Sequence, residues 1–126
     1  MAKRESIDIP GMPHGAPIPN GCKIGNLVYS SGIVGRDLET GKIPTDLDEQ
    51  ARCMFANVRK FIELAGGTPN DIAKVTVFMN DENQREPINK EWIKMFPDEH
   101  SRPARHALQS TVRGGAAFQV EVIAVL

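Results

Sequence analysis

Alternating polar and apolar positions predict short β-strands near the start of the chain. Residues 5–9 alternate in this way and predict a first strand. Lys23-Ile24 and residues 27–31 carry strand-forming side chains on either side of Gly25-Asn26, a dipeptide that favours a tight turn, so together they predict a β-hairpin. Segments rich in glycine, proline and polar residues predict loops on both sides of this hairpin, at 10–21 and 33–45.

The clearest predicted helix begins at Asp46. This residue stands three positions before Glu49, which makes an aspartate form of the capping box. Apolar side chains then recur every three or four positions and define one helix face: Ala51, Met54, Phe55, Val58, Phe61, Ile62 and Ala65. Gly66-Gly67 provides the conformational freedom that a helix C-terminus uses, so we expect the helix to end there.

A second helix and three further strands are predicted in the rest of the chain. The helix extends from Asn83 or Gln84 to Phe96, with Pro87 in its first turn and Pro97 just beyond its end. Its apolar face carries Ile88, Trp92, Met95 and Phe96. β-Branched and apolar residues predict strands at 73–79, 105–112 and 118–126.

The resulting order, β-ββ-α-β-α-ββ, indicates an α+β fold with a mixed sheet of about six strands and two helices on one face. The last strand, however, is apolar on both sides. Phe118, Val120, Val122, Ala124 and Leu126 point one way, and Gln119, Glu121, Ile123 and Val125 point the other. Because two helices cover only one face, the other is expected to pack against another copy of the chain. The pattern therefore predicts a homo-oligomer, with Gln119 and Glu121 at a cleft between subunits.

Composition and charge narrow the class of protein. The 126 residues suffice for one domain, 1–126, and the apolar share of 40% and charged share of 25% are ordinary for a globular protein. The formal net charge of −1 lacks the basic surface that nucleic-acid binding requires, so no nucleic-acid partner is expected. No apolar run has the length of a membrane span, and the N-terminus lacks the apolar segment of a signal peptide. We therefore expect a cytoplasmic protein without a membrane partner.

The cysteines and histidines do not form a metal-binding pattern. Cys22 and Cys53 are far apart and neither belongs to a CxxC motif, so both are predicted to be free thiols. The histidines likewise lack the spacing of metal ligands: His14, His100 and His106. Gly66-Gly67 is not followed by the lysine of a phosphate-binding loop. No metal site is therefore predicted.

Two charged residues in the C-terminal strands are the main candidates for chemistry. Arg105 begins a strand after Pro103-Ala104, where its planar guanidinium can either form a salt bridge or hold the carboxylate of a ligand. Glu121 interrupts a nearly apolar strand. Its carboxylate can form a buried ion pair, face water at an edge, or accept a proton from water or an amine.

Three polar or flexible positions are weaker candidates. Ser31-Gly32 either simply ends the hairpin strand or holds a polar group of a substrate, with Gly32 allowing close backbone approach. Asn89 lies on the second helix, where exposure to solvent is the simplest interpretation. His106 is expected to point to the sheet face opposite Arg105. Because no Ser/His/Asp arrangement is evident, no serine nucleophile is predicted.

At these residues the chain resembles the Rid or YjgF family of reactive intermediate deaminases, also called the endoribonuclease L-PSP family. The matching stretches follow one another over nearly the whole chain: residues 23–32 (KIGNLVYSSG), 50–52 (QAR), 57–60 (NVRK), 65–67 (AGG), 74–78 (KVTVF), Asn89, Pro103-Ala104-Arg105 and 120–125 (VEVIAV). Each stretch alone is a weak signal, whereas the ordered set is specific.

The resemblance implies a chorismate-mutase-like α+β fold that assembles as a barrel-like homotrimer with clefts between subunits. It also implies hydrolysis of reactive 2-enamine and 2-imine carboxylic acids, such as 2-aminoacrylate, to 2-keto acids and ammonia, without a cofactor. By the same resemblance, Arg105 binds the substrate carboxylate and Glu121 lies near the attacked carbon, where it orients water. Ser31, Gly32 and Asn89 would line the cleft.

The chain departs from the family pattern at three positions of the expected pocket. Ile18 stands where the family usually has a tyrosine, Ile33 where it has a glutamine, and Ala107 where it often has a cysteine. These replacements predict a more apolar pocket and a larger substrate, for example an aminomuconate-type intermediate of aromatic-ring cleavage.

Two other functions stay open here. One is a trimer that binds small carboxylates or regulates without turnover. The other is a ribonuclease or translation inhibitor, against which the net charge of −1 argues.

Overall fold

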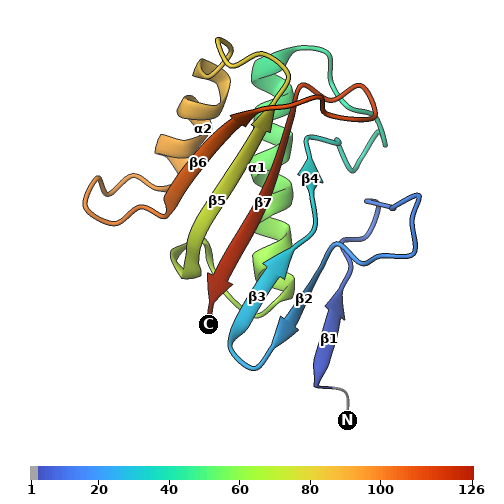
Figure 1. The fold of residues 1–126 in the computed structure, drawn as a ribbon, viewed down its shortest axis with the longest axis vertical. Coiled ribbons are helices and arrows are strands. Elements are labelled where there is room, and N and C mark those ends of the chain that lie inside the picture. The colour runs from blue at the N-terminus through green and yellow to red at the C-terminus, as the bar shows by residue number, and fades with distance from the viewer. Residues whose placement is uncertain (1–2) are drawn as a thin grey trace.

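A mixed β-sheet packs against two helices in the computed structural model, which describes residues 3–126 (Figure 1). The seven strands are β1 (Arg4–Ile7), β2 (Gly21–Ile24), β3 (Leu27–Ser30), β4 (Ile33–Val34), β5 (Ile72–Met79), β6 (Ala104–Gln109) and β7 (Phe118–Val125). Helices α1 (Leu47–Leu64) and α2 (Glu86–Met95) lie on one face of the sheet, and a short 3₁₀ helix, Pro69–Asp71, precedes β5. The predicted α+β class, with two helices on one side, is therefore confirmed.

The sheet order places β7 in the middle and β6 at an edge. The strands follow the order β1-β2-β3-β7-β5-β6, and β4 pairs with β7 beyond the end of β3. β7 is antiparallel to β3, β4 and β5, whereas β5 and β6 are parallel. Parallel neighbours cannot be joined by a tight turn, so the chain crosses between β5 and β6 through α2. This crossover brings α2 over the β6 edge.

Strand β4 lies inside a segment that was predicted to be a loop, 33–45. Ile33 pairs with Val120 and Val34 with Gln119. Two residues are too few to show an alternating pattern, so the sequence contained no periodic signal for this strand. It forms because β7 extends beyond β3 and offers free backbone partners there.

Two other strand boundaries differ from the predictions. The first strand is Arg4–Ile7 rather than 5–9. Strand β6 ends at Gln109 and does not reach residue 112. The side chain of Asn80 accepts a hydrogen bond of 2.6 Å from the backbone N–H of Val112, and this contact holds the segment outside the sheet.

The helices begin and end close to the predicted positions. The carboxylate of Asp46 caps α1 by accepting from the backbone N–H of Glu49 at 3.0 Å. The Glu49 side chain contacts Arg52 instead of completing the capping box. Gly66 follows α1 with a φ of +96°, and Pro87 lies in the first turn of α2. Neither helix in residues 3–126 has both the length and the apolar composition needed to cross a bilayer.

The core lies between α1 and one side of β7. Alternate residues of β7 are at most 1% exposed: Phe118, Val120, Val122 and Ala124. They belong to one cluster with Met54, Phe61 and Ile62 of α1. Burial of an apolar side chain of this size is worth about 1.5–3 kcal/mol, so this packing determines which way β7 faces. The predicted alternation of β7 is confirmed, and Gln119 and Glu121 point away from the helices.

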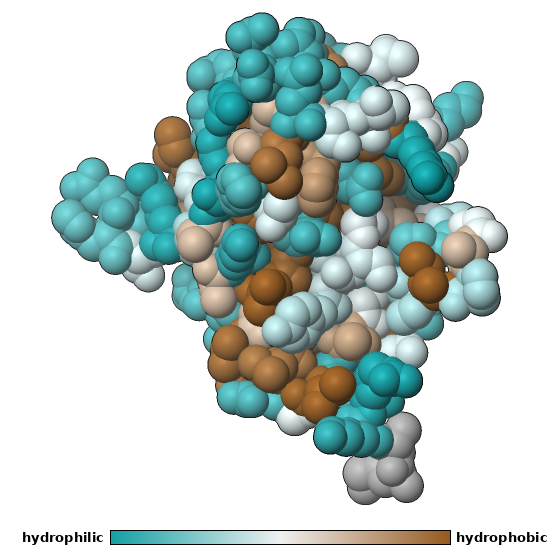
Figure 2. All heavy atoms as spheres, viewed as in Figure 1, coloured by the Kyte–Doolittle hydropathy of each residue, from teal (hydrophilic) through white to brown (hydrophobic). Residues whose placement is uncertain are grey.

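The sheet side opposite the helices, here called the open face, has no helix over it among residues 3–126. Apolar side chains gather on it. Figure 2 shows them toward the bottom of the view, where Figure 1 draws β3 and the end of β7. Those at least 36% exposed are Ile24, Leu27, Tyr29, Leu108 and Val125. The strand register sets Leu27 beside Val125 and Tyr29 beside Ile123. This is the face that was expected to pack against another copy of the chain.

Gln50 joins three segments from inside the core. Only 2% of this residue is exposed. Its amide donates to the carbonyl of Pro44 at 2.9 Å, and its oxygen accepts from the backbone N–H groups of Ala117 at 2.7 Å and Phe118 at 3.2 Å. It therefore ties the loop before α1 to the start of β7.

We expect Gln50→Ala to lower the free energy of unfolding by about 2–3 kcal/mol, because it leaves buried backbone groups without partners. Urea denaturation monitored by circular dichroism measures the change. The exposed Gln84→Ala is the control and should shift stability by less than about 0.5 kcal/mol. Equal effects of the two substitutions would contradict the role assigned to Gln50.

Candidate functional site

Ser31-Gly32 lies at a β-bulge beside Glu121. The pairing of β3 with β7 stops at Tyr29, and β4 resumes it at Ile33 with one extra residue on the hairpin side. Residues 30–32 therefore stand opposite only two residues of β7, one of which is Glu121. Bulges re-aim side chains and often border functional sites. The structure thus brings two sequence-predicted site segments together within one chain.

Contacts of Ser31 bring the loop before β2 to the same place. The Ser31 hydroxyl donates to the carbonyl of Pro19 at 2.9 Å, and its backbone N–H donates to the carbonyl of Asn20 at 2.7 Å. Ile18, the residue before Pro19, is 49% exposed. Ile18 therefore presents an apolar side chain near the bulge, and its place in a substrate pocket stays a prediction.

Gly32 permits a close approach, although to a side chain of the same protein. A Cβ atom at this position would lie 1.6 Å from Nε2 of Gln119. Any larger residue would therefore displace Gln119, which lies two positions before Glu121 on the same side of β7. The close approach of Gly32 to a substrate stays a prediction.

Glu121 is exposed on the open face. Thr76 pairs with Glu121 on one side and with His106 on the other, so these three side chains line up across β7, β5 and β6. Glu121 has no ion-pair partner among residues 3–126. The alternative of a buried ion pair is therefore wrong for the single chain, and the carboxylate is free to contact water or a ligand.

Arg105 lies on the helix side of the β6 edge. Its Nη2 donates to Oδ1 of Asn89 at 2.8 Å, and its guanidinium carbon lies 5.0 Å from the centre of the Trp92 ring. Burial, and after it the positive charge of Arg85, lowers the pKa of Arg105 from its usual value. Arg105 has no acidic partner among residues 3–126. A half-buried, oriented and unpaired guanidinium is suited to binding a carboxylate.

The single chain does not unite these residues in one site. Arg105 pairs with Val75, which faces the helices, whereas Glu121 pairs with Thr76, which faces away. β5 also separates β6 from β7, so the two strands are roughly 10 Å apart. There are thus two groups. The bulge group contains Ile18, Ser31, Gly32 and Glu121, and the edge group contains Arg105 and Asn89.

Comparison with known proteins identifies the family of this chain. Residues 16–126 match the family model described as Endoribonuclease L-PSP. The chain belongs to this family, which is also called the Rid or YjgF family. The resemblance inferred from the motifs is therefore confirmed.

Several named relatives of this Rid family member come from Escherichia coli strain K12. The protein is 37% identical over 112 residues to TdcF, which is named a reactive intermediate deaminase; the match covers 86% of each chain. It is 32% identical over 111 residues to 2-iminobutanoate/2-iminopropanoate deaminase, with 86% of this chain and 87% of that one covered. The crystal structure of E. coli TdcF with bound serine superposes with a TM-score of 0.88 at 30% identity, covering 97% of this chain and 98% of that one.

The three departures from the family pattern have different structural consequences. Ile18 is exposed beside the bulge group, and Ala107 is half-buried on the same side of β6 as Arg105. Ile33 is 0% exposed and belongs to the core. The interpretation that Ile33 makes the pocket more apolar is therefore wrong, because its side chain points under α1.

Sequence reasoning missed Trp92 and Arg85 as neighbours of Arg105. Trp92 was assigned only to the apolar helix face, yet it also lies against the guanidinium. The helical spacing contained the signal, because Arg85, Asn89 and Trp92 are separated by four and three residues and so share one side of α2. Without knowledge that α2 covers β6, however, nothing connected that side to Arg105.

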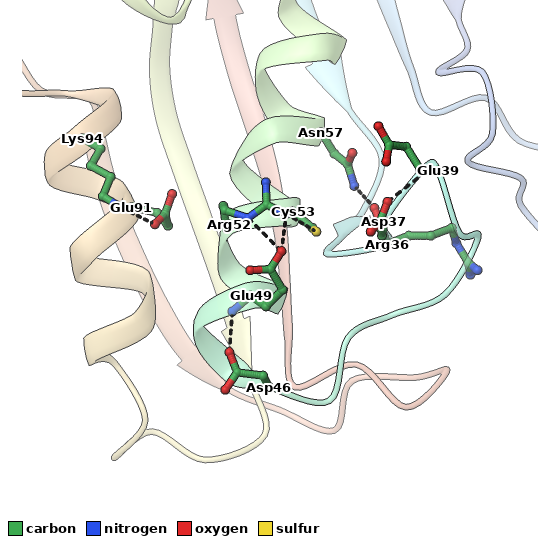
Figure 3. Close-up of polar contacts among 10 residues, drawn as sticks. All are labelled: Arg36, Asp37, Glu39, Asp46, Glu49, Arg52, Cys53, Asn57, Glu91 and Lys94. Atoms are coloured by element: carbon green, nitrogen blue, oxygen red, sulfur yellow. Dashed lines mark hydrogen bonds and ion pairs between the residues drawn. The ribbon is translucent and has the colours of Figure 1, made fainter.

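Polar residues outside the bulge group and the edge group surround Cys53, and their contacts have a structural explanation. A hollow of about 300 Å³ lies between α1 and the loop after β4 (Figure 3). Asn57 lines this hollow, and its side-chain amide donates to the carbonyls of Val34 and Arg36, both at 2.9 Å. Arg52 forms an ion pair with Glu49. Asn57 therefore holds the loop on the helix, and the Arg52–Glu49 pair lies within α1, so these contacts do not indicate a ligand site.

Cys53 should react slowly with alkylating reagents. It is 5% exposed, and burial raises the pKa of its thiol, which keeps it protonated at neutral pH. At pH 8 we expect iodoacetamide to modify Cys53 at least about tenfold more slowly in the folded protein than in denaturant. Peptide mass spectrometry separates it from Cys22, and Cys53→Ser provides the Cys22-only control. Equal rates in folded and unfolded protein would contradict the assignment.

Proposed function

We propose that this protein hydrolyses reactive 2-enamine and 2-imine carboxylic acids to 2-keto acids and ammonia. The observation that carries the proposal is Arg105, a half-buried guanidinium held by Asn89 and Trp92 without an acidic partner in residues 3–126. The names of the two E. coli relatives support the reaction class. Arg105 would bind the substrate carboxylate through two hydrogen bonds and so orient the reacting carbon.

The chemistry then needs only water and a carboxylate. The enamine tautomerises to an imine, whose carbon is electrophilic. Glu121 orients a water molecule and accepts its proton as the oxygen bonds to that carbon. Glu121 then passes this proton to the nitrogen, which gives a neutral carbinolamine. The carbinolamine loses ammonia when Glu121 moves the proton of the new hydroxyl group to the nitrogen and the C–N bond breaks, which leaves the keto acid. Because these steps involve proton transfer alone, the proposal includes no cofactor and no metal.

We further propose that a homotrimer completes the site, with the bulge group of one copy facing the edge group of the next. Two features support this arrangement. Within one chain Arg105 and Glu121 lie on opposite sheet faces, and the open face exposes the apolar side chains of Leu27, Tyr29 and Val125. Packing the open faces together would bury these side chains and bring the β6 edge of one copy toward the bulge of its neighbour.

Substitution of Arg105 tests the substrate-binding role. We expect Arg105→Ala to lower kcat/KM for 2-iminobutanoate by roughly 100- to 1,000-fold, because the fixed charge at the carboxylate is lost. The kcat/KM of Arg105→Lys should lie between those of the wild type and Arg105→Ala, because lysine keeps the positive charge but lacks the planar guanidinium. The imine is generated in situ by an amino-acid oxidase, and ammonia release is measured above the spontaneous rate. Arg59→Ala, an exposed arginine on α1, is the matched control.

The same measurements separate turnover from binding alone. A protein that binds 2-oxobutanoate through Arg105 but releases no ammonia from any imine would be a carboxylate-binding trimer. Undiminished activity of Arg105→Ala would refute the assignment of the site altogether.

A mixing experiment tests whether two copies form one site. Arg105→Ala and Glu121→Gln should each be nearly inactive alone. If both groups are needed and come from different copies, refolding an equal mixture of the two variants restores about a quarter of wild-type activity, because that fraction of interfaces pairs an intact Arg105 with an intact Glu121. Light scattering gives the number of subunits. A mixture that stays inactive although mixed oligomers form would refute a shared site.

A further inference from the structure

A second hollow, of about 410 Å³, opens beside the bulge group. Gly32 and Gln119 line it on the sheet side. Its other walls come from the loop before β2, from β4 and the loop after it, and from the loop between β6 and β7. These three loops contribute His14, Arg36 and Arg113. The hollow therefore shares Gly32 with the candidate site but contains residues to which no role has been assigned so far.

The charge of this hollow is one-sided. Two arginines line it, and no aspartate or glutamate of the described residues does. The hollow beside Cys53, which Arg36 also lines, differs because Asp37 and Glu39 line it as well. Unbalanced guanidinium groups in a concave site attract an anion and can hold it by charge-assisted hydrogen bonds.

Two nitrogen atoms of this lining are buried without a partner. They are Nε2 of His14 and Nε of Arg36, neither of which has a hydrogen-bond partner in residues 3–126. Arg36 is nevertheless held in place, because its Nη1 donates to the carbonyl of Gly41 at 2.6 Å. Figure 3 shows the Arg36 side chain extending away from Asp37 and Asn57. Buried polar groups are usually satisfied, and Nε of an arginine is always a donor, so the unpartnered Nε of Arg36 indicates an acceptor supplied by a ligand.

The hollow is also close to the position proposed for the chemistry. Gln119 and Glu121 lie on the same side of β7, and two residues of a strand span about 7 Å. A substrate whose reacting carbon lies at Glu121 could therefore extend a side chain of a few bonds into the hollow.

We propose that this hollow binds a second acidic group of the substrate, through Arg113 and Arg36. The inference rests on the proposed function, because it takes Glu121 as the place of reaction. It assigns the substrate to a class: 2-imino or 2-enamino acids whose side chain ends in a carboxylate or a phosphate. Arg113 and Arg36 would select such substrates over those with a short apolar side chain.

Binding of product-like acids tests the inference without relying on turnover. Calorimetry compares 2-oxobutanoate with 2-oxoglutarate, which adds a carboxylate, and with 3-phosphonooxypyruvate, which adds a phosphate. We expect at least one of the two diacids to bind about tenfold or more tightly than the monoacid. The one that binds tighter identifies the acidic group.

Arg113→Gln, at an exposed position, should reduce that affinity ratio to near one, whereas Arg59→Gln should leave it unchanged. Equal affinity of all three acids for the wild-type protein, or an equal loss of all three in Arg113→Gln, would overturn the inference. Failure of the proposed function gives a different result: the protein then releases no ammonia from either 2-iminobutanoate or 2-iminoglutarate. The binding ratio still decides the anion site in that case.

Discussion

The backbone pairing of β7 (Phe118–Val125) is the constraint on which the rest of this structure depends. β7 is hydrogen-bonded to β3 and β4 on one side and to β5 on the other, and every second side chain packs under α1. Because side chains alternate along a strand, burial of Val120 and Val122 forces Glu121 onto the open face. A slip of one residue would bury the carboxylate and expose the core, so the hydrophobic packing fixes the position of this candidate catalytic side chain as firmly as it fixes the fold.

Arg105 depends on a different constraint, the crossover of α2. The parallel pairing of β5 and β6 requires the chain to return over the helix side of the sheet, and this return places Asn89 and Trp92 above the β6 edge. A guanidinium that has lost part of its hydration normally acquires an acidic partner. Here an amide oxygen and an aromatic ring orient it, and no carboxylate of residues 3–126 neutralises it. Within residues 3–126 the fold thus leaves this guanidinium without an anion, as the proposed binding of a substrate carboxylate requires.

These two constraints explain why assembly and activity are linked in the proposed function. The bulge that carries Ser31, Gly32 and Glu121 and the edge that carries Arg105 belong to opposite sides of one sheet. No rotation of side chains brings them together in one chain. A neighbouring copy can do so, and the apolar side chains of the open face provide a reason for that copy to bind. The cationic hollow beside Gly32 would then extend the shared site toward the substrate side chain.

The sequence by itself determined both helices, the hairpin, the alternation of β7 and the family, because each depends on local periodicity, on turn and cap residues, or on an ordered set of motifs. It also identified Arg105 and Glu121 as candidates. Only the tertiary structure decided that these two lie on opposite faces, that Ile33 is a core residue, and that β4, the bulge and the cationic hollow exist. All of these follow from which strand pairs with which, and in what register. Such pairing joins residues that are far apart in the chain, so no local pattern encodes it.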